Sequence, residues 1–298
     1  MTTQVTVGYN GTTTSTEAVH WAAAEAAVRG ASLRIVTCYE IPVMGEAVIG
    51  WPATEAVAAL LDVAETSVEG MRRVIAAEHH SLVITTEASP GPAAVVLLKD
   101  LGPDDLVVIG AGTRGGAAAT WLGSTPRDVV RHSPCPVVVV RGAASRGTPD
   151  RVMVGVDGSE VSDLALEWAA DEADRHGVDL VVVHGWRYPY LVAEHESTAA
   201  RDLMHIDAAC VLERAVELAR DRCGVEVHGM LVEQDAVSAL LDSAHDGDLI
   251  AVGSRGRGAV KAGLFGSTTN SLLDRSALPV VVVRDLRHEN AHHEEIAP

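Results

Sequence analysis

Short apolar runs alternate along the chain with longer segments of helical periodicity. In the first half we expect strands at Val5–Tyr9, Leu33–Tyr39, Leu82–Thr86, Leu106–Ile109 and Val137–Val140, and helices at Thr16–Arg29, about Thr54–Glu78, Ala93–Leu101 and around Arg127–His132. The strands are continuous runs such as VVVV rather than alternating patterns, which is typical of parallel strands covered on both faces. The pattern predicts an α/β fold with doubly wound, mostly parallel five-stranded sheets of Rossmann-like type.

The second half of the chain repeats the first. At a shift of 147 residues, Gly8, Asn10, Gly11, Trp21, Gly30, Leu33 and Pro42 fall on Gly155, Asp157, Gly158, Trp168, Gly177, Leu180 and Pro189. Later the shift is 143, and Asp105, Gly110, Gly123, Ser124, Pro136 and Arg141 fall on Asp248, Gly253, Gly266, Ser267, Pro279 and Arg284. The predicted elements are duplicated too, at Val152–Val156, Asp163–His176, Leu180–His184, Ala199–Cys223, Val225–Val232, Val237–His245, Leu249–Val252 and Val280–Val283.

A period this long indicates two whole domains rather than a solenoid of short repeats. We expect one domain at residues 1–143 and a second at 151–285. The glycine, serine and proline content of the segment Gly142–Asp150 predicts a linker, placed at 144–150. The polar tail 286–298 is expected to be disordered.

A glycine-rich basic loop follows the strand Leu249–Val252 and leads into a helix, with Ser267 or Thr268 expected as the cap. A helix N-terminus presents unpaired N–H groups and a partial positive charge, so such a loop suits an anion. Gly253 and Gly256 are expected to let the backbone approach the ligand, because a Cβ atom there would hold it off.

The loop after the first strand of the second half carries Gly155 and Asp157. In doubly wound sheets ligands bind beyond the carboxyl ends of the strands where the strand order reverses, so this loop and the glycine loop should converge. Asp157 would repel a phosphate, and we expect it at the far end of a longer ligand, accepting hydrogen bonds from a sugar or base. This arrangement indicates a nucleotide.

These residues resemble the universal stress protein family in its tandem two-domain, actinobacterial-type form. The family's glycine motif is a glycine, two residues, a second glycine, nine residues, and then glycine with serine or threonine. This chain reproduces it with Gly253, Gly256, Gly266 and Ser267. The segments VGVDGS at 154–159 and VVVVR at 280–284 resemble the family's first and last strands. The resemblance covers nearly the whole chain twice, and it implies the adenine nucleotide α-hydrolase-like variant of the Rossmann-like fold.

The resemblance also implies that the second half binds ATP, with Mg²⁺ as a candidate companion ion. The implied nucleotide-binding residues are Gly155, Asp157, Val183, Gly253, Ser254, Arg255, Gly256, Arg257, Gly258, Gly266, Ser267 and Thr268, with Val183 and His184 near the base. The first half keeps Gly8, Gly110, Gly123 and Ser124 but carries Asn10 for aspartate and Thr113 for Gly256. We therefore expect a degenerate first site, whose nucleotide binding is weakened or altered.

Composition narrows the choice of partners. A formal net charge of −18 and a pI near 5.0 disfavour nucleic acid and anionic membranes. No apolar run approaches the roughly 20 residues that span a bilayer, and the N-terminus lacks a signal-peptide pattern, so we expect a cytoplasmic protein. The cysteines lack CxxC spacing and are expected to be small buried side chains, and we predict no metal site.

The leading hypothesis is a nucleotide-dependent stress or signalling module that acts through contacts with an unknown protein partner. No GxxxxGK[ST] loop and no catalytic residue are evident, so we expect at most a weak ATPase. The alternatives are a slow ATPase or an autophosphorylating or adenylating enzyme, and a nucleotide-free dimeric scaffold. Because Val137–Val140 and Val280–Val283 would be bare edges, we expect them to pair the two halves, with a homodimer also open.

Overall fold

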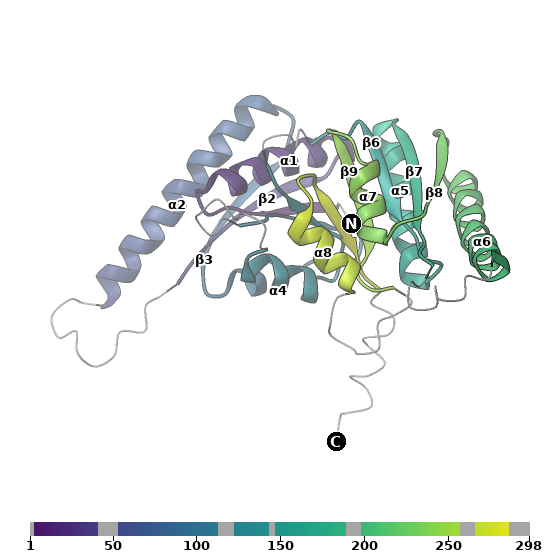
Figure 1. The fold of residues 1–298 in the computed structure, drawn as a ribbon. Helices are drawn as coiled ribbons and strands as arrows, with labels where there is room; N and C mark the ends of the chain where they lie inside the picture. Colours follow the sequence, from purple (N-terminus) through teal and green to yellow (C-terminus); the bar gives the residue numbers. More distant parts are fainter. Residues whose placement is uncertain are drawn as a thin grey trace, which may run out of the picture. The chain divides into compact units, whose positions relative to one another are not determined.

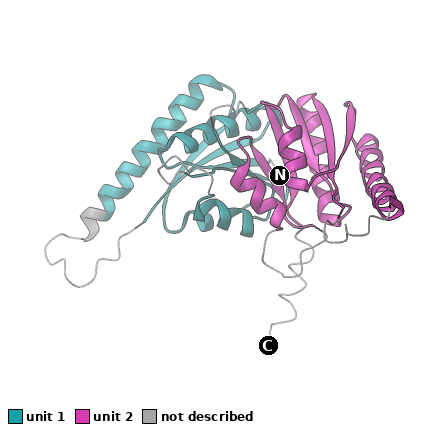
Figure 2. Ribbon diagram, in the orientation of Figure 1, with its two compact units in different colours: residues 1–148 teal, residues 149–298 magenta. Residues whose placement is uncertain are grey.

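The computed structural model describes residues 3–40, 53–112, 122–142, 147–188, 198–256 and 266–285. They belong to two compact units, residues 1–148 and 149–298 (Figure 2). Every strand pairing within a unit is parallel, and helices separate successive strands. The predicted α/β class with doubly wound parallel sheets is confirmed.

The first unit consists of β1 (Gln4–Gly8), α1 (Thr13–Arg29), β2 (Ser32–Tyr39), α2 (Ala53–Glu78), β3 (Ile84–Pro90), α3 (Ala93–Leu97), β4 (Leu106–Gly110), α4 (Ser124–His132) and β5 (Val137–Val140). The second unit consists of β6 (Arg151–Gly155), α5 (Glu160–His176), β7 (Asp179–Gly185), α6 (Thr198–Arg222), β8 (Val227–Val232), α7 (Ala236–Ser243), β9 (Asp248–Gly253), α8 (Ser267–Arg275) and β10 (Val280–Val283).

The strand order is β3-β2-β1-β4-β5 in the first unit and β8-β7-β6-β9-β10 in the second. In each unit the second and third strands lie on one side of the first strand, and the fourth and fifth strands lie on its other side. The order therefore reverses between β1 and β4, and between β6 and β9. Loops that leave neighbouring strands at this point diverge and open a crevice beyond their carboxyl ends.

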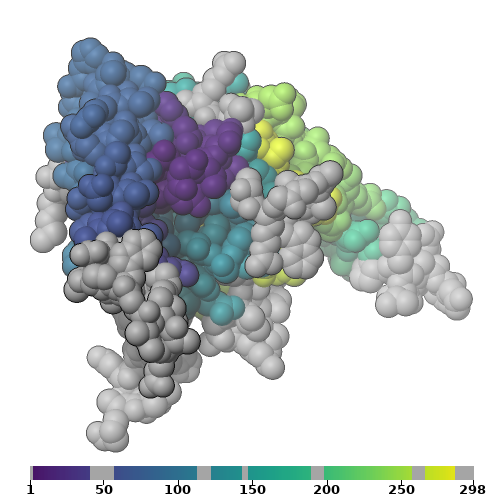
Figure 3. All heavy atoms as spheres, turned by 90° about the vertical axis from the view of Figure 1, so that its left-hand side faces the viewer, coloured from purple at the N-terminus to yellow at the C-terminus, as the bar shows by residue number. Residues whose placement is uncertain are grey.

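Helices cover both faces of each sheet, which explains the continuous apolar strands. In the first unit α1 and α2 cover one face and α3 and α4 the other (Figure 1). The atoms of α1 and α2 lie side by side at the surface (Figure 3). The two helices are linked by His20 and Glu78, whose Nδ1 and Oε2 atoms are 3.0 Å apart. All four residues of β5 are buried, as are all five of β4.

Several element boundaries differ from the sequence-based prediction. Helix α1 begins at Thr13 rather than Thr16, because the side chain of Thr12 caps it by accepting a bond from the backbone N–H of Ser15. Strand β3 runs to Pro90 because it pairs with β2 along its whole length, and the edge position tolerates the proline. Helix α3 ends at Leu97, four residues before the predicted end.

Within the described residues, none of the helices combines the length and the apolar character that crossing a bilayer requires.

Candidate functional site

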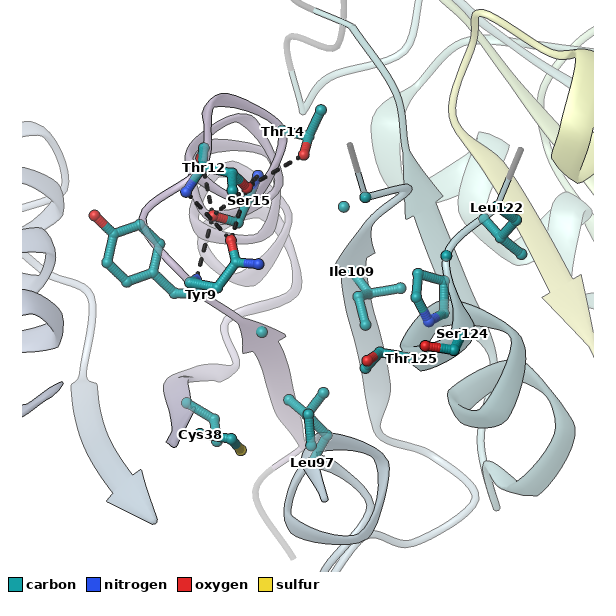
Figure 4. A pocket seen from close by; sticks show the side chains of 18 of the residues that line it. Tyr9, Thr12, Thr14, Ser15, Cys38, Leu97, Ile109, Leu122, Ser124 and Thr125 are labelled. Carbon is teal, nitrogen blue, oxygen red and sulfur yellow. Dashed lines mark hydrogen bonds between the residues drawn. The ribbon is translucent and has the colours of Figure 1, made fainter. Parts of the chain in front are cut away.

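A cavity of about 510 Å³ lies at the point of strand reversal in the first unit (Figure 4). Its lining comprises Gly8, Tyr9, Asn10, Thr12, Thr14, Ser15, Val36, Cys38, Ala93, Leu97, Ile109, Gly110, Gly112, Leu122, Gly123, Ser124, Thr125, Pro126 and Arg127. Thr12 and Ser15 lie on one side of the close-up, and Ser124 and Thr125 lie on the other. The predicted first-half residues therefore come together in one cavity.

The turn after β1 is fixed by side-chain hydrogen bonds. Asn10 Oδ1 accepts bonds from Thr12 N at 3.2 Å and from Thr12 Oγ1 at 2.7 Å. In the second unit Asp157 Oδ1 accepts equivalent bonds from Ser159 N at 3.0 Å and Ser159 Oγ at 2.6 Å. Asparagine therefore reproduces the local turn that aspartate makes, without the charge.

The helices that follow the glycine loops begin without a side-chain cap. Gly123 is the N-cap of α4 and Gly266 is the N-cap of α8, and neither has a side chain that can accept a bond from the helix. By contrast, Thr12, Ser159 and Asp235 cap α1, α5 and α7 with side-chain bonds. The predicted cap at Ser267 or Thr268 is wrong by one or two residues, since both belong to the first turn. Their backbone N–H groups have no intrahelical acceptor and suit an anion.

The third residue of the helix differs between the units. Thr269 in α8 is 2% exposed, and its Oγ1 donates a 2.8 Å bond to the carbonyl of Gly253, tying the helix to the end of β9. Pro126 occupies the equivalent place in α4 and has no backbone N–H. The first turn of α4 thus offers one amide fewer, but Arg127 lines the cavity beside it.

Packing requires glycine at two positions of the motif. A Cβ atom on Gly253 would lie 2.9 Å from the carbonyl oxygen of Val161, at the start of α5. The equivalent atom on Gly110 would lie 2.7 Å from the carbonyl oxygen of Thr14. These distances are too short for a real Cβ atom, so glycine here lets the helix approach the sheet. Packing against α5 thus requires glycine at position 253, and the expected close approach of a ligand there stays a prediction.

Gly256 is also enclosed by the protein. A Cβ atom on it would overlap Asp157 Oδ2, which lies against the glycine loop. Asp157 is therefore beside the second glycine of the motif rather than far from the loop. Because the turn fixes Oδ1, the second carboxylate oxygen is the one that faces the loop.

Gly266 is the motif glycine that contacts among the described residues do not explain. A Cβ atom there would be 3.5 Å from Arg255 Cα, an ordinary contact, and its φ of −59° is accessible to any residue. Gly123 is similar, with Pro126 Cδ at 3.4 Å. A space kept free of a side chain at an uncapped helix start is what close approach of a ligand requires.

Gly8 and Gly155 lie at the ends of the first strands and face leucines. Their Cβ atoms would lie 3.3 Å from Leu97 Cδ1 and 2.9 Å from Leu240 Cδ1, respectively. Gly8 lines the cavity together with Leu97, so a larger residue there would narrow it.

The backbone around Ser254 and Val183 is already used by the fold. Ser254 is 5% exposed, its N–H donates to the carbonyl of Val283 at 2.7 Å, and its own carbonyl accepts from Gly266 N at 3.0 Å. The carbonyl of Val183 accepts a 3.0 Å bond from Val156 N. Ser254 therefore shapes the loop, and Val183 supports the turn after β6.

His184 is 9% exposed, and its Nδ1 lies 2.7 Å from the carbonyl oxygen of Val156. In the first unit, Thr37 Oγ1 makes the equivalent 3.0 Å bond to the carbonyl of Tyr9. Both side chains hold the turn after the first strand from the neighbouring strand. Of the other predicted residues, Arg255 is half-buried, whereas Arg257, Gly258 and Thr113 lie outside the described residues.

Sequence reasoning missed several lining residues of the first cavity, notably Thr14, Cys38, Leu97 and Arg127. Burial is the main cause that raises the pKa of the Cys38 thiol to about 11, helped by the charge of Glu87. The expectation of buried cysteines is confirmed for Cys135 and Cys223, but Cys210 is exposed and Cys38 is half-buried. A signal for Cys38 was its position at the carboxyl end of the predicted second strand.

Comparison with known proteins gives one family. A family model described as the universal stress protein family matches residues 1–141 and 149–284. A universal stress protein of Mycolicibacterium smegmatis is 31% identical over 295 residues, covering 94% of this chain and 96% of its own. Universal stress protein Rv2005c of Mycobacterium tuberculosis is 31% identical over 302 residues, with the same coverage. A solved universal stress protein from Archaeoglobus fulgidus shares the fold, with a TM-score of 0.67, 20% identity and coverage of 94% of this chain and 98% of that chain.

Proposed function

This chain belongs to the universal stress protein family, and we propose that it binds adenine nucleotides, with ATP in the second unit. We further propose that the bound nucleotide changes the contacts that the protein makes with a partner protein. The residue-level support comes from the two uncapped helix starts at the points of strand reversal.

One observation carries the proposal. Gly266 begins α8 without a side-chain cap, and neither its backbone conformation nor its packing against the described residues requires glycine. The backbone N–H groups of Ser267 and Thr268 have no carbonyl acceptor within the helix, and the two side chains add hydroxyl groups. A phosphate accepts hydrogen bonds and favours the positive end of a helix dipole, so it satisfies these groups.

The remaining residues have separate roles in this proposal. The glycine loop and α8 hold the phosphates, while Gly155 and Asp157 line the adenosine side and the turn supported by Val183 borders the base. Asp157 Oδ2 lies against Gly256, so it can accept a bond from a ribose hydroxyl near the loop. Mg²⁺ accompanying ATP would neutralise part of the phosphate charge.

The test begins with the nucleotide content of the purified protein, followed by ATP binding measured by calorimetry. The double substitution Gly266→Ala and Ser267→Ala should lower ATP affinity in the second unit at least about tenfold, because it fills the approach and removes a donor. Ser271→Ala, one turn further along α8, is the matched control and should leave the affinity unchanged. Equal affinity in the double variant and the control would contradict the proposed cradle.

Turnover with added Mg²⁺ separates the alternatives. Retained ATP without product supports the binding module. ADP, phosphorylated protein or pyrophosphate would instead identify a slow ATPase, an autophosphorylating protein or an adenylating enzyme, with Ser267 and Thr268 as the hydroxyls nearest the phosphates. If the purified protein contains no nucleotide and none binds on addition, the result supports the nucleotide-free dimeric scaffold.

A further inference from the structure

One face of α2 is exposed, uncharged and mostly apolar. Val63 and Val74 on this face are 67% and 45% exposed, although both are large apolar side chains. They alternate with other exposed uncharged residues at spacings of three and four, which places all of them along one side of the helix. The exposed face of α2 consists of Ala59, Val63, Thr66, Gly70, Val74 and Ala77. At about 1.5 Å per residue it is about 27 Å long.

Helix α6 of the second unit shows the same helix with a charged face. The two helices correspond at a shift of 144 residues, because the contact between His20 and Glu78 in the first unit is matched by one between Glu167 and Arg222 in the second. At this shift three uncharged residues of the α2 face correspond to charged residues of α6. Val63, Gly70 and Ala77 fall on Asp207, Arg214 and Asp221.

The charges of α6 are compatible with the fold. Arg214 lies 2.6 Å from Asp163 of α5, and its side chain is 55% exposed. Packing of this helix on its sheet therefore does not require an uncharged face. In the first unit, Gly70 and Thr16 occupy the places of these two residues and cannot form the ion pair. The difference leaves an apolar surface on α2 that the fold of the unit does not explain.

Gly70 is the least expected residue of the exposed face. It lies in the interior of α2, where glycine is less favourable for the helix than alanine is. A Cβ atom at this position would meet no described atom within 4 Å, so packing within the unit does not exclude a side chain. A glycine on an exposed helix face instead allows the backbone of a second helix to approach closely.

Charges beside this face favour a second copy of the same helix. Asp62 and Arg73 are eleven residues apart, about three turns, so they lie along the same edge of the face. A two-fold axis between residues 67 and 68 places Asp62 of each copy opposite Arg73 of the other. The face is therefore complementary in charge to an antiparallel copy of itself.

The partners of these charges within the unit leave them accessible. Glu69 accepts two 2.7 Å bonds from Arg72, and the Nε atom of Arg73 is 3.6 Å from the same carboxylate. The side chain of Arg73 is nevertheless 74% exposed, and Asp62 is exposed without an ion pair among the described residues. Arg73 can therefore contact a second carboxylate from another copy.

We propose that two copies of this chain associate through an antiparallel pairing of their α2 helices. Val63 of each copy packs between Gly70 and Val74 of the other, and Asp62 pairs with Arg73 at both ends of the contact. One helix pair of this length lies at the small end of specific interfaces, so the dimer depends on protein concentration. The described lining of the first cavity includes no residue of α2, so the pairing does not depend on the proposed nucleotide function.

Sedimentation velocity of the full chain at concentrations from about 1 to 500 µM measures this association. The unsubstituted protein should shift from a 31.2 kDa monomer toward a dimer as the concentration rises. Val63→Glu should raise the dissociation constant at least about tenfold, because the contact would desolvate an unpaired carboxylate. Val95→Glu adds the same charge at a 69% exposed valine of the same unit and should leave the constant unchanged.

Gly70→Arg introduces the residue that the second unit carries at this position. It should also raise the dissociation constant at least about tenfold, because the side chain fills the place of close approach. The monomer should be no less stable to heat, because arginine is the better helix former and no described atom obstructs it. Thermal unfolding measured at a concentration where the protein is monomeric separates this effect from misfolding.

A charge exchange tests the antiparallel orientation. At low ionic strength Arg73→Glu should weaken the dimer about tenfold, because it places like charges opposite each other at both ends. Adding Asp62→Arg to this variant exchanges the two charges and should return the dissociation constant to within about threefold of the original. A double variant that stays as weak as Arg73→Glu alone would contradict the proposed arrangement.

Two further results would overturn the inference. One is a protein that remains monomeric over the whole concentration range. The other is a dimer that both Val63→Glu and Gly70→Arg leave intact, which would place the contact on another surface. In either case ATP binding to the second unit, measured by calorimetry, would be unaffected.

Discussion

The two units build their sites on the same hydrogen bonds but furnish them with different charges. In each unit an oxygen of Asn10 or Asp157 accepts two bonds from the helix cap, and a side chain of the next strand, Thr37 or His184, supports the same turn. These bonds shape the backbone, and asparagine makes them as well as aspartate does. The duplicated halves therefore preserve the geometry of this turn, while Asn10 lacks the charge that Asp157 carries.

The largest expected effect concerns the equivalent residues Asp105 and Asp248. Asp248 is 2% exposed, makes a bidentate pair with Arg151 at 3.0 and 2.7 Å, and accepts a 2.7 Å bond from His245 N. Asp105 accepts bonds from Gln4 N and Gly102 N but has no arginine partner in these bonds. Asp248→Ala should lower the free energy of unfolding by about 3 kcal/mol, because the Arg151 guanidinium and the His245 N–H both lose their acceptor.

Asp105→Ala should lower the free energy of unfolding by about 1–2 kcal/mol, because two backbone N–H groups lose their acceptor but no charged group loses a partner in these bonds. Urea unfolding of both variants, followed by a probe for each unit, measures the two losses. Equal losses would show that the arginine pair adds nothing to the second unit.

The next effect compares glycines within one unit. Gly110→Ala places a Cβ atom 2.7 Å from the Thr14 carbonyl oxygen, which forces α1 away from β4 and should cost about 2 kcal/mol. Gly123→Ala meets only ordinary contacts and should change stability by less than about 0.5 kcal/mol while narrowing the cavity. Thermal unfolding checks both, and a Gly123→Ala variant that is the less stable of the two would reverse the assignment.

The smallest effect compares the starts of α3 and α7. Asp235 caps α7, whereas Pro92 at the equivalent position of α3 makes no side-chain cap. A hydrogen bond from the backbone N–H of Ser238, and another from its hydroxyl, lower the pKa of Asp235 below its usual 3.8. A depressed folded-state pKa means that the stabilisation is present above the unfolded pKa and is lost as the pH falls through the folded value.

Asp235→Ala should therefore cost about 1 kcal/mol at pH 7, and the difference should vanish in strong acid. Pro92→Ala, which removes no cap, should show no such pH dependence. Urea unfolding of both variants across this pH range is the measurement, and a constant difference for Asp235→Ala would contradict the capping role.

The apolar runs predicted the strands and the duplication well because burial on both faces of a parallel sheet demands them. Val137–Val140 and Val280–Val283, for example, are found with the predicted bounds. The expected pairing of the halves through these two strands stays a prediction. Helix starts were less well predicted, since a cap such as Thr12 is recognised by the bond that it makes rather than by its residue type.

The motif glycines show why the site was only partly predictable. A glycine in a sequence indicates that a side chain is excluded, but not which neighbour excludes it. At Gly253 the neighbour is Val161, at Gly256 it is Asp157, and at Gly266 the described residues come no closer than the 3.5 Å of Arg255 Cα. Cys38 was missed for a related reason, because its distance from the motif in the chain hides its place beside the cavity.

The most direct test of the account is a crystal structure of the protein grown with saturating ATP and Mg²⁺. We predict phosphate oxygens within hydrogen-bonding distance, about 2.7–3.2 Å, of the backbone N–H groups of Ser267 and Thr268, with the space beside Gly266 filled by the ligand. The central claim would be contradicted if the phosphates bind elsewhere, or if only water contacts the N-terminus of α8 at saturating ATP.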